Sequence, residues 1–224
     1  MNVKQLLPKL RHERWMGWTQ VAGRRLVEMP VFGLPRVALG EDTPERFSFI
    51  TKTGLLSDDW QGHSFGEWEA IAVSNLARRP RRWQVKEHSG GVLGFGAKPS
   101  RLEYFDEFAC EQVLDAAFMN EAHALLSSPL LVVAIPVRGI LAVADGKDQA
   151  QVGKIIDYAH RGFVGAPEGL EPLTPHAITI QDGRPAGIVQ GTRSGMPEID
   201  RQHIEPERGF PWPAQDAGAS GADD

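Results

Sequence analysis

Apolar residues in this chain form one block with a clear pattern, residues 107–145. Its first half spaces apolar side chains as a helix does, over 108–126, and its second half holds two apolar runs, 130–135 and 140–144. Only residues 136–139 join these runs, which predicts an antiparallel pair, because a parallel crossover needs about a dozen residues or more. Strands without a polar face are covered on both sides. The block therefore predicts a buried core unit.

Two helices are predicted around this pattern from their start signals. Ser64 and Glu67 make a capping box, and the amphipathic helix that they begin ends before Pro80. Asp115 is a typical first residue of a helix, so residues 108–126 are compatible with one bent helix or with two.

A further helix follows the apolar block. It begins at Asp148, with Gln151 three residues on, and Gly162 suits its C-terminal cap. The inner face of this helix consists of Val152, Ile155, Ile156 and Ala159.

The remaining strands are shorter and flanked by turn residues. Residues 45–52 alternate apolar and polar positions, and weaker strand patterns occur at 83–85 and 102–104. The last hairpin covers 176–190 and turns at Asp182 and Gly183, a strong hairpin dipeptide. The order of elements predicts an α+β fold, with a largely antiparallel sheet of five to seven strands and about three packed helices.

The pattern divides the chain into three parts. Residues 1–35 are an N-terminal segment with one short helix at 3–10, which Pro8 interrupts. Residues 36–190 form a single domain, within which the glycine-rich stretch 89–98 is a connector or a partner-contact loop. Residues 191–224 are rich in Gly, Pro, Ala and Asp and are predicted to be mostly disordered.

Charge narrows the function classes. The chain has 224 residues and a formal net charge of -5. Residues 191–224 carry seven acidic and three basic residues, a net -4, so the rest is close to neutral. Nucleic-acid binding proteins carry a basic footprint, and this balance argues against broad nucleic-acid binding.

Cysteine, histidine and glycine patterns predict no cofactor and no metal. The single cysteine, Cys110, excludes an internal disulfide and sits on an apolar helical face, as a buried and inert thiol would. The seven histidines form no HxH or HExxH motif, and no P-loop, GxSxG or dinucleotide fingerprint is present. The N-terminus lacks a secretory signal, and the longest apolar run is far short of a membrane span. The expected location is the cytoplasm.

Four polar residues are weak candidates for a catalytic or ligand site: Asp145, His160, Glu121 and Asp115. Asp145 ends a buried strand, where turn chemistry is the simpler role, and His160 lies three residues after Asp157 on one helix, where an exposed pair is the simpler reading.

Tryptophans and arginines supply candidate partner contacts. The tryptophans in loops or near the N-terminus, which are either exposed contacts or buried satellites, are Trp15, Trp18 and Trp60. The one basic cluster, which is either a contact surface or a solvated helix end, is Arg78, Arg79, Arg81 and Arg82.

The segments VLDAAFMNEAHALL and LLVVAIPVRGILAVAD, followed by the Asp-Gly hairpin, resemble the C-terminal part of the YtpQ-like family of uncharacterised bacterial proteins. The stretch RFSFITKTGLLSDDW with the following helix resembles the family's strand, loop and helix, so the resemblance covers roughly residues 36–190. It implies a bacterial cytoplasmic protein, and it assigns no catalytic residue because the family has no known activity.

Together these features favour a non-enzymatic interaction or accessory protein, such as a toxin-neutralising protein of the immunity type, with a protein partner. The alternative is an enzyme or small-ligand binder with a site near Asp145 and His160. A third hypothesis is weak nucleic-acid binding through residues 78–82.

Overall fold

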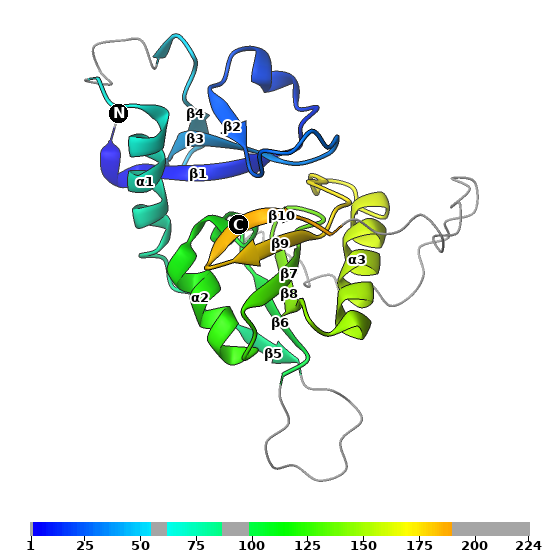
Figure 1. The fold of residues 1–224 in the computed structure, drawn as a ribbon. Helices are drawn as coiled ribbons and strands as arrows, with labels where there is room; N and C mark the ends of the chain where they lie inside the picture. Colours follow the sequence, from blue (N-terminus) through cyan, green and yellow to red (C-terminus); the bar gives the residue numbers. More distant parts are fainter. Residues whose placement is uncertain (1, 55–61, 87–98, 190–224) are drawn as a thin grey trace, which may run out of the picture.

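The computed structural model describes residues 2–54, 62–86 and 99–189, which form two antiparallel sheets and three α-helices (Figure 1). The smaller sheet consists of β1 (Leu6–Arg11), β2 (Gly23–Arg25), β3 (Arg36–Asp42) and β4 (Phe47–Phe49). The larger sheet consists of β5 (Gln84–Lys86), β6 (Arg101–Phe105), β7 (Leu130–Ala134), β8 (Ile140–Asp145), β9 (Ile178–Gln181) and β10 (Arg184–Ile188). The helices are α1 (Phe65–Leu76), α2 (Ala116–Leu125) and α3 (Gln149–Val164).

The larger sheet has the strand order β10-β9-β7-β8-β6-β5, with every neighbouring pair antiparallel. Helix α3 covers one face, where Val132, Ala142 and Ala144 pack against Ile155. The short 3-10 helix η5 (Cys110–Leu114) and α2 cover the other face, where Val133 meets residues such as Phe118. The α+β class and the two-sided burial of β7 and β8 are confirmed.

The smaller sheet joins the larger one through shared core residues. Strand β3 pairs with β1 along its whole length on one side and with β2 and β4 on the other. Leu10 and Val37 belong to the same apolar cluster as Val133 of the larger sheet. Helix α1 packs on this smaller sheet, with Trp68 and Ala72 against Leu6, Leu39 and Ile50. The segment before residue 36 is therefore an integral part of the fold.

Local start signals are confirmed. Ser64 and Glu67 form a reciprocal capping box at the start of α1. The carboxylate of Asp115 accepts the backbone N–H groups of Ala117 and Phe118, so the segment 108–126 is a 3-10 helix followed by a separate α-helix. Asp148 begins α3 in the same way.

Two local predictions are wrong. Residues 3–10 are not a helix: after a 3-10 turn, η1 (Val3–Gln5), the chain enters β1. Pro8 is tolerated there because β1 is an edge strand, in which a missing N–H costs no ladder bond. Gly162 does not end α3, which continues to Val164, and Gly165 takes the cap position. Gly162 is buried, and the ring of Phe163 packs 5.7 Å from His12 in centroid distance, so tertiary contacts favour a further turn.

The predicted glycine-rich loop 89–98 and the segment 191–224 lie outside the described residues. Within the described part of the chain, every helix is too short or too polar to cross a membrane.

Candidate functional site

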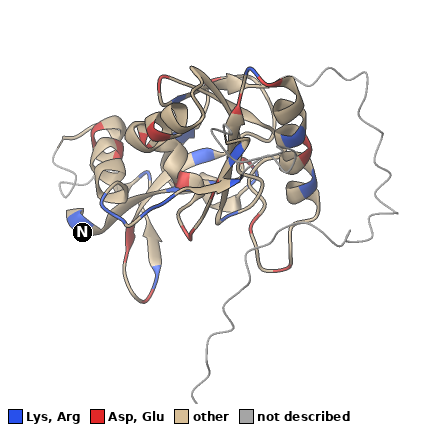
Figure 2. Cartoon of the chain, turned by 90° about the horizontal axis from the view of Figure 1, so that it is seen from below, with Lys and Arg blue, Asp and Glu red and all other residues tan. Residues whose placement is uncertain are grey.

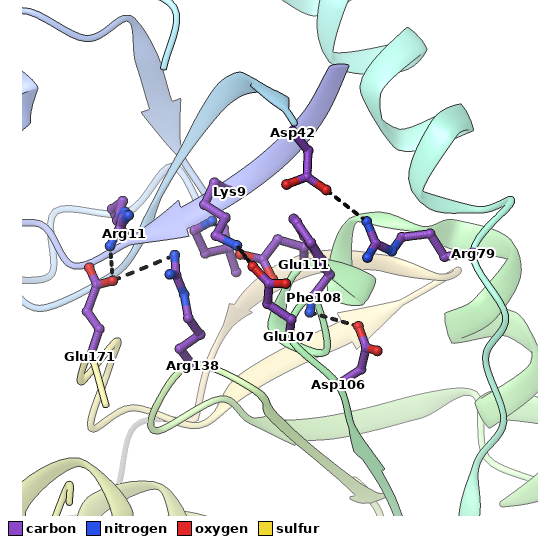
Figure 3. Close-up of polar contacts among 11 residues, drawn as sticks. Lys9, Arg11, Asp42, Arg79, Asp106, Glu107, Phe108, Glu111, Arg138 and Glu171 are labelled. Atoms are coloured by element: carbon purple, nitrogen blue, oxygen red, sulfur yellow. Dashed lines mark hydrogen bonds and ion pairs between the residues drawn. The ribbon is translucent and has the colours of Figure 1, made fainter. Parts of the chain in front are cut away.

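Six charged side chains meet where the smaller sheet rests on the larger one (Figure 3). The three cations are Lys9 and Arg11 of β1 and Arg138 of the turn between β7 and β8. The three carboxylates are Glu107, just before η5, Glu111 in η5, and Glu171 in the loop after α3. Lys9 Nζ lies 3.2 Å from Glu107 Oε1, and the guanidinium groups of Arg11 and Arg138 share Glu171. We call these six residues the charged seam.

Glu111 is the most deeply buried carboxylate of the seam, at 1 % exposure. Its Oε1 accepts the backbone N–H of Leu10 at 2.9 Å. Burial raises the pKa of the Glu111 carboxyl, and the charge of Lys9, the Leu10 N–H and Arg138 oppose this rise. Burial likewise lowers the pKa of the Lys9 ammonium, and the carboxylates of Glu111 and Glu107 oppose that shift.

Glu111 of the seam, together with Asn75 of α1, also closes the outer edge of β1. Asn75 Nδ2 donates to the carbonyl oxygens of Val3 and Leu6, at 2.8 and 2.9 Å. Pro8 has no N–H, and the N–H of Leu10 donates to Glu111. An open strand edge is a template for unwanted pairing, and here side chains from α1 and η5 occupy it.

The charged seam has a structural role rather than a catalytic one. A desolvated lysine can serve as a nucleophilic amine, because burial lowers the pKa of its ammonium. However, the Lys9 side chain is only 1 % exposed, and its ammonium lies 3.8 Å from the ring centroid of Phe108 and 5.1 Å from that of Phe47. A substrate cannot reach it in this state. The seam therefore fastens the two sheets together.

The four predicted catalytic candidates do not meet. Asp115 caps α2 and pairs with Arg81, and Glu121 is exposed on α2. His160 lies on α3, which covers the opposite face of the larger sheet. Asp145 accepts the Ser128 hydroxyl at 2.5 Å and the backbone N–H of Lys147 at 2.9 Å, which is strand-end turn chemistry.

Asp157 does not contact His160 as an ion pair; its Oδ1 accepts Arg161 Nε at 2.8 Å. Cys110 is buried, and its thiol lies 3.1 Å from the carbonyl oxygen of Val137. Burial raises the pKa of this thiol, which keeps it protonated and unreactive.

Three of the four clustered arginines are committed to partners within the chain. Arg78 donates to Asn75, Arg79 to Asp42, and Arg81 to Asp115. Arg79 and Arg81 also lie over the rings of Phe108 and Phe118. Figure 2 shows Lys and Arg interspersed with Asp and Glu along the described chain.

The tryptophans differ in exposure. Trp18 is buried and donates its indole N–H to the His12 carbonyl at 2.9 Å. Trp15 is half-buried, with its ring edge-on to Trp18 at 5.2 Å and 4.7 Å from the ring of Phe49 in centroid distance. These two form a satellite cluster beside β3. Trp60 lies outside the described residues.

Three other side chains are exposed on two segments that a hydrogen bond joins. Met16 is 83 % exposed and Phe32 is 59 % exposed. Arg14 is also exposed, and its guanidinium lies 4.5 Å from the ring centroid of Phe32. We call Arg14, Met16 and Phe32 the Phe32 patch. Sequence reasoning missed it; the only available signal was a lone aromatic residue in a loop bounded by Pro30 and Pro35.

The backbone beneath the Phe32 patch is fixed by hydrogen bonds. Glu13 accepts the N–H of Gly33 at 2.8 Å, which ties the segment of Arg14 and Met16 to that of Phe32. His176 Nε2–H donates to the Phe32 carbonyl at 2.9 Å. Gly33 has a φ of 85°, a conformation that few other residues adopt at low cost. The patch is therefore presented on an ordered support.

Among the described residues, no three His, Cys, Asp or Glu side chains are grouped so that they could hold a metal ion. No protein-family model matches the chain, and neither the curated proteins nor the solved structures contain a significant match. The resemblance to the YtpQ-like family therefore stays a prediction, and the geometry alone carries the functional argument.

Proposed function

We propose that this protein is a non-enzymatic interaction protein of the cytoplasm that binds another protein through the Phe32 patch. The observation that carries this proposal is the exposure of the Phe32 ring with the Arg14 guanidinium over it, on two hydrogen-bonded segments that also carry the exposed Met16. Aromatic residues, Met and Arg are the types enriched at protein interfaces. An ordered support lowers the entropy lost on binding, which favours affinity.

The arrangement of the other groups supports the same proposal. The candidates for catalysis act as caps or turn ligands or stand apart, and the charges of the seam pair with one another. A toxin-neutralising or other accessory role fits a protein of this kind, because such a role needs a complementary surface and no reacting group.

The test compares capture of partners by two variants of the full chain. The patch variant carries Phe32→Ala and Met16→Ala, and the matched control carries Leu125→Ala and Val164→Ala, two apolar residues exposed elsewhere. We expect the affinity of a partner recovered from the source organism to fall about thirtyfold or more in the patch variant, since the change removes two exposed residues of types enriched at interfaces. The control is expected to bind as the wild type does.

Equal loss of binding in both double variants would show that neither surface is specific. Recovery of no stoichiometric partner by the wild type would contradict the proposal itself.

A further inference from the structure

The outer strands of the two sheets differ in how their edges are protected from further pairing. At one end of the larger sheet, β10 contains Pro185, and its register shifts between Pro185 and Gly187. A proline and a bulge both interrupt further pairing. In the smaller sheet, β1 is closed by Pro8, Asn75 and Glu111, as described above. Both edges are thus protected.

Strand β5, at the other end of the larger sheet, has neither a proline nor a bulge. All three of its residues are exposed. Val85 is 47 % exposed, which is high for a β-branched residue in a strand. Within the described residues, β5 pairs only with β6. It is therefore the terminal strand of the larger sheet whose described residues contain neither a proline nor a register shift.

The two faces of this edge differ in chemistry. Residues that pair directly point to the same face of a sheet. Val85 pairs with Leu102 and thus belongs to the apolar face. Lys86 pairs with Arg101, and both cations share the single buried carboxylate of Glu103, at 3.5 and 2.6 Å. The edge is apolar on one face and positively charged on the other.

Arg82 adds to this positive charge. It is exposed two residues before β5 and makes no ion pair with any residue that the structure describes. A strand added to β5 would gain from carboxylates on the side of Lys86 and from an apolar side chain next to Val85, because opposite charges and apolar pairs across strands are favourable.

We infer that the edge of β5 accepts an extended segment of a partner protein as a seventh strand, with acidic and β-branched apolar residues in alternation. This surface is separate from the Phe32 patch, so the inference does not depend on that patch. A second copy of the chain is a poorer occupant, because antiparallel pairing about Val85 places Lys86 diagonally opposite the Lys86 and Arg82 of the other copy. Backbone hydrogen bonds supply affinity in this mode, and alternate side chains supply specificity.

The test is a selection of random peptides displayed on phage, with the full chain as bait. Enriched peptides are expected to alternate acidic and β-branched residues. One selected peptide is then measured against Lys86→Glu, which reverses the edge charge, and against Lys86→Gln, which only removes it. Arg184→Glu, a reversal at an exposed position of the protected edge β10, is the matched control. We expect affinity to fall about tenfold for Lys86→Glu, less for Lys86→Gln, and to stay within about twofold for Arg184→Glu.

Enrichment of no peptide, or of peptides without alternation, would overturn the inference. An equal loss of affinity in Lys86→Glu and Arg184→Glu would overturn it too, because the effect would then come from net charge. A wild-type dimer that Val85→Lys converts to monomer would assign the edge to a second copy. Thermal unfolding of each variant identifies any that fails to fold, and Lys86→Gln, the mildest change, then supplies the comparison.

Discussion

Helix α3 and strand β1 lie on opposite sides of the larger sheet and are held by different chemistry. On the α3 side, Ile155 and Ala159 meet small apolar residues of β7 and β8, and the contact is hydrophobic. On the β1 side, Leu10 enters the core, but Lys9 and Arg11 on either side of it pair with carboxylates. Apolar contacts tolerate small shifts in position, whereas charged pairs fix one alignment and penalise any other. The charged seam is thus the more geometrically specific of the two contacts.

The substitution with the largest expected effect on the β1 side is Glu111→Ala. The substitution removes the acceptor of the Leu10 N–H and leaves part of the buried charge of Lys9 and Arg138 uncompensated. We expect the free energy of unfolding to fall by about 3–5 kcal/mol, measured by urea denaturation. Glu121→Ala, at an exposed position of α2, is the control and is expected to change stability by less than about 0.5 kcal/mol. A loss below about 1 kcal/mol for Glu111→Ala would show that the seam does not hold the sheets.

The second prediction probes the apolar side with Ile155→Ala. Ile155 is fully buried between α3 and the larger sheet, so truncation removes apolar contact and leaves a cavity. The expected loss is about 2–4 kcal/mol, again by urea denaturation, with exposed Lys154→Ala as the control on the same helix. If Ile155→Ala proves more damaging than Glu111→Ala, the order of importance given to the two sides is reversed.

The smallest expected effect is the dependence of the free energy of unfolding on pH through Glu111. Its pKa in the folded state is raised above the ordinary value of 4.5. The folded state therefore holds this proton more tightly than the unfolded state, and stability from Glu111 is complete below about pH 4.5 and is lost as pH rises through the raised pKa.

This dependence is measured as the difference in unfolding free energy between the wild type and Glu111→Gln from about pH 4 to about pH 8. We expect the wild type to lose stability relative to Glu111→Gln as pH rises, by no more than about 1.4 kcal/mol per pH unit. A flat difference would mean that Lys9, Leu10 and Arg138 fully offset the burial of the carboxylate.

Features set by neighbouring residues could be predicted from the sequence. The capping box of Ser64, the cap at Asp115 and the turn at Gly183 depend on contacts within three or four positions. The pairing of β7 with β8 depends on a connection of a few residues. Each of these leaves its signal in a short window.

The smaller sheet and the charged seam could not be predicted because their contacts are distant in sequence. Leu10 and Glu111 are 101 positions apart, and Arg11 and Glu171 are 160 apart. In sequence, Lys9 and Glu111 look like ordinary surface charges, and Pro8 looks like a helix breaker. Only the pairing of β1 with β3 shows why a proline and a lysine belong in a buried strand.

The closed edge of β1 has a consequence for synthesis of the chain on the ribosome. Strands β1 and β3 are complete once residue 42 has emerged, but Asn75 and Glu111, which close the edge, follow later. At about 5–20 residues per second, Glu111 emerges roughly 3–14 s after β3. Until Asn75 emerges, the edge of the nascent sheet has Pro8 as its only guard among these three residues, and Glu111 is the last to arrive. A chaperone that binds strand edges would find its target on this protein early in translation, before the larger sheet exists.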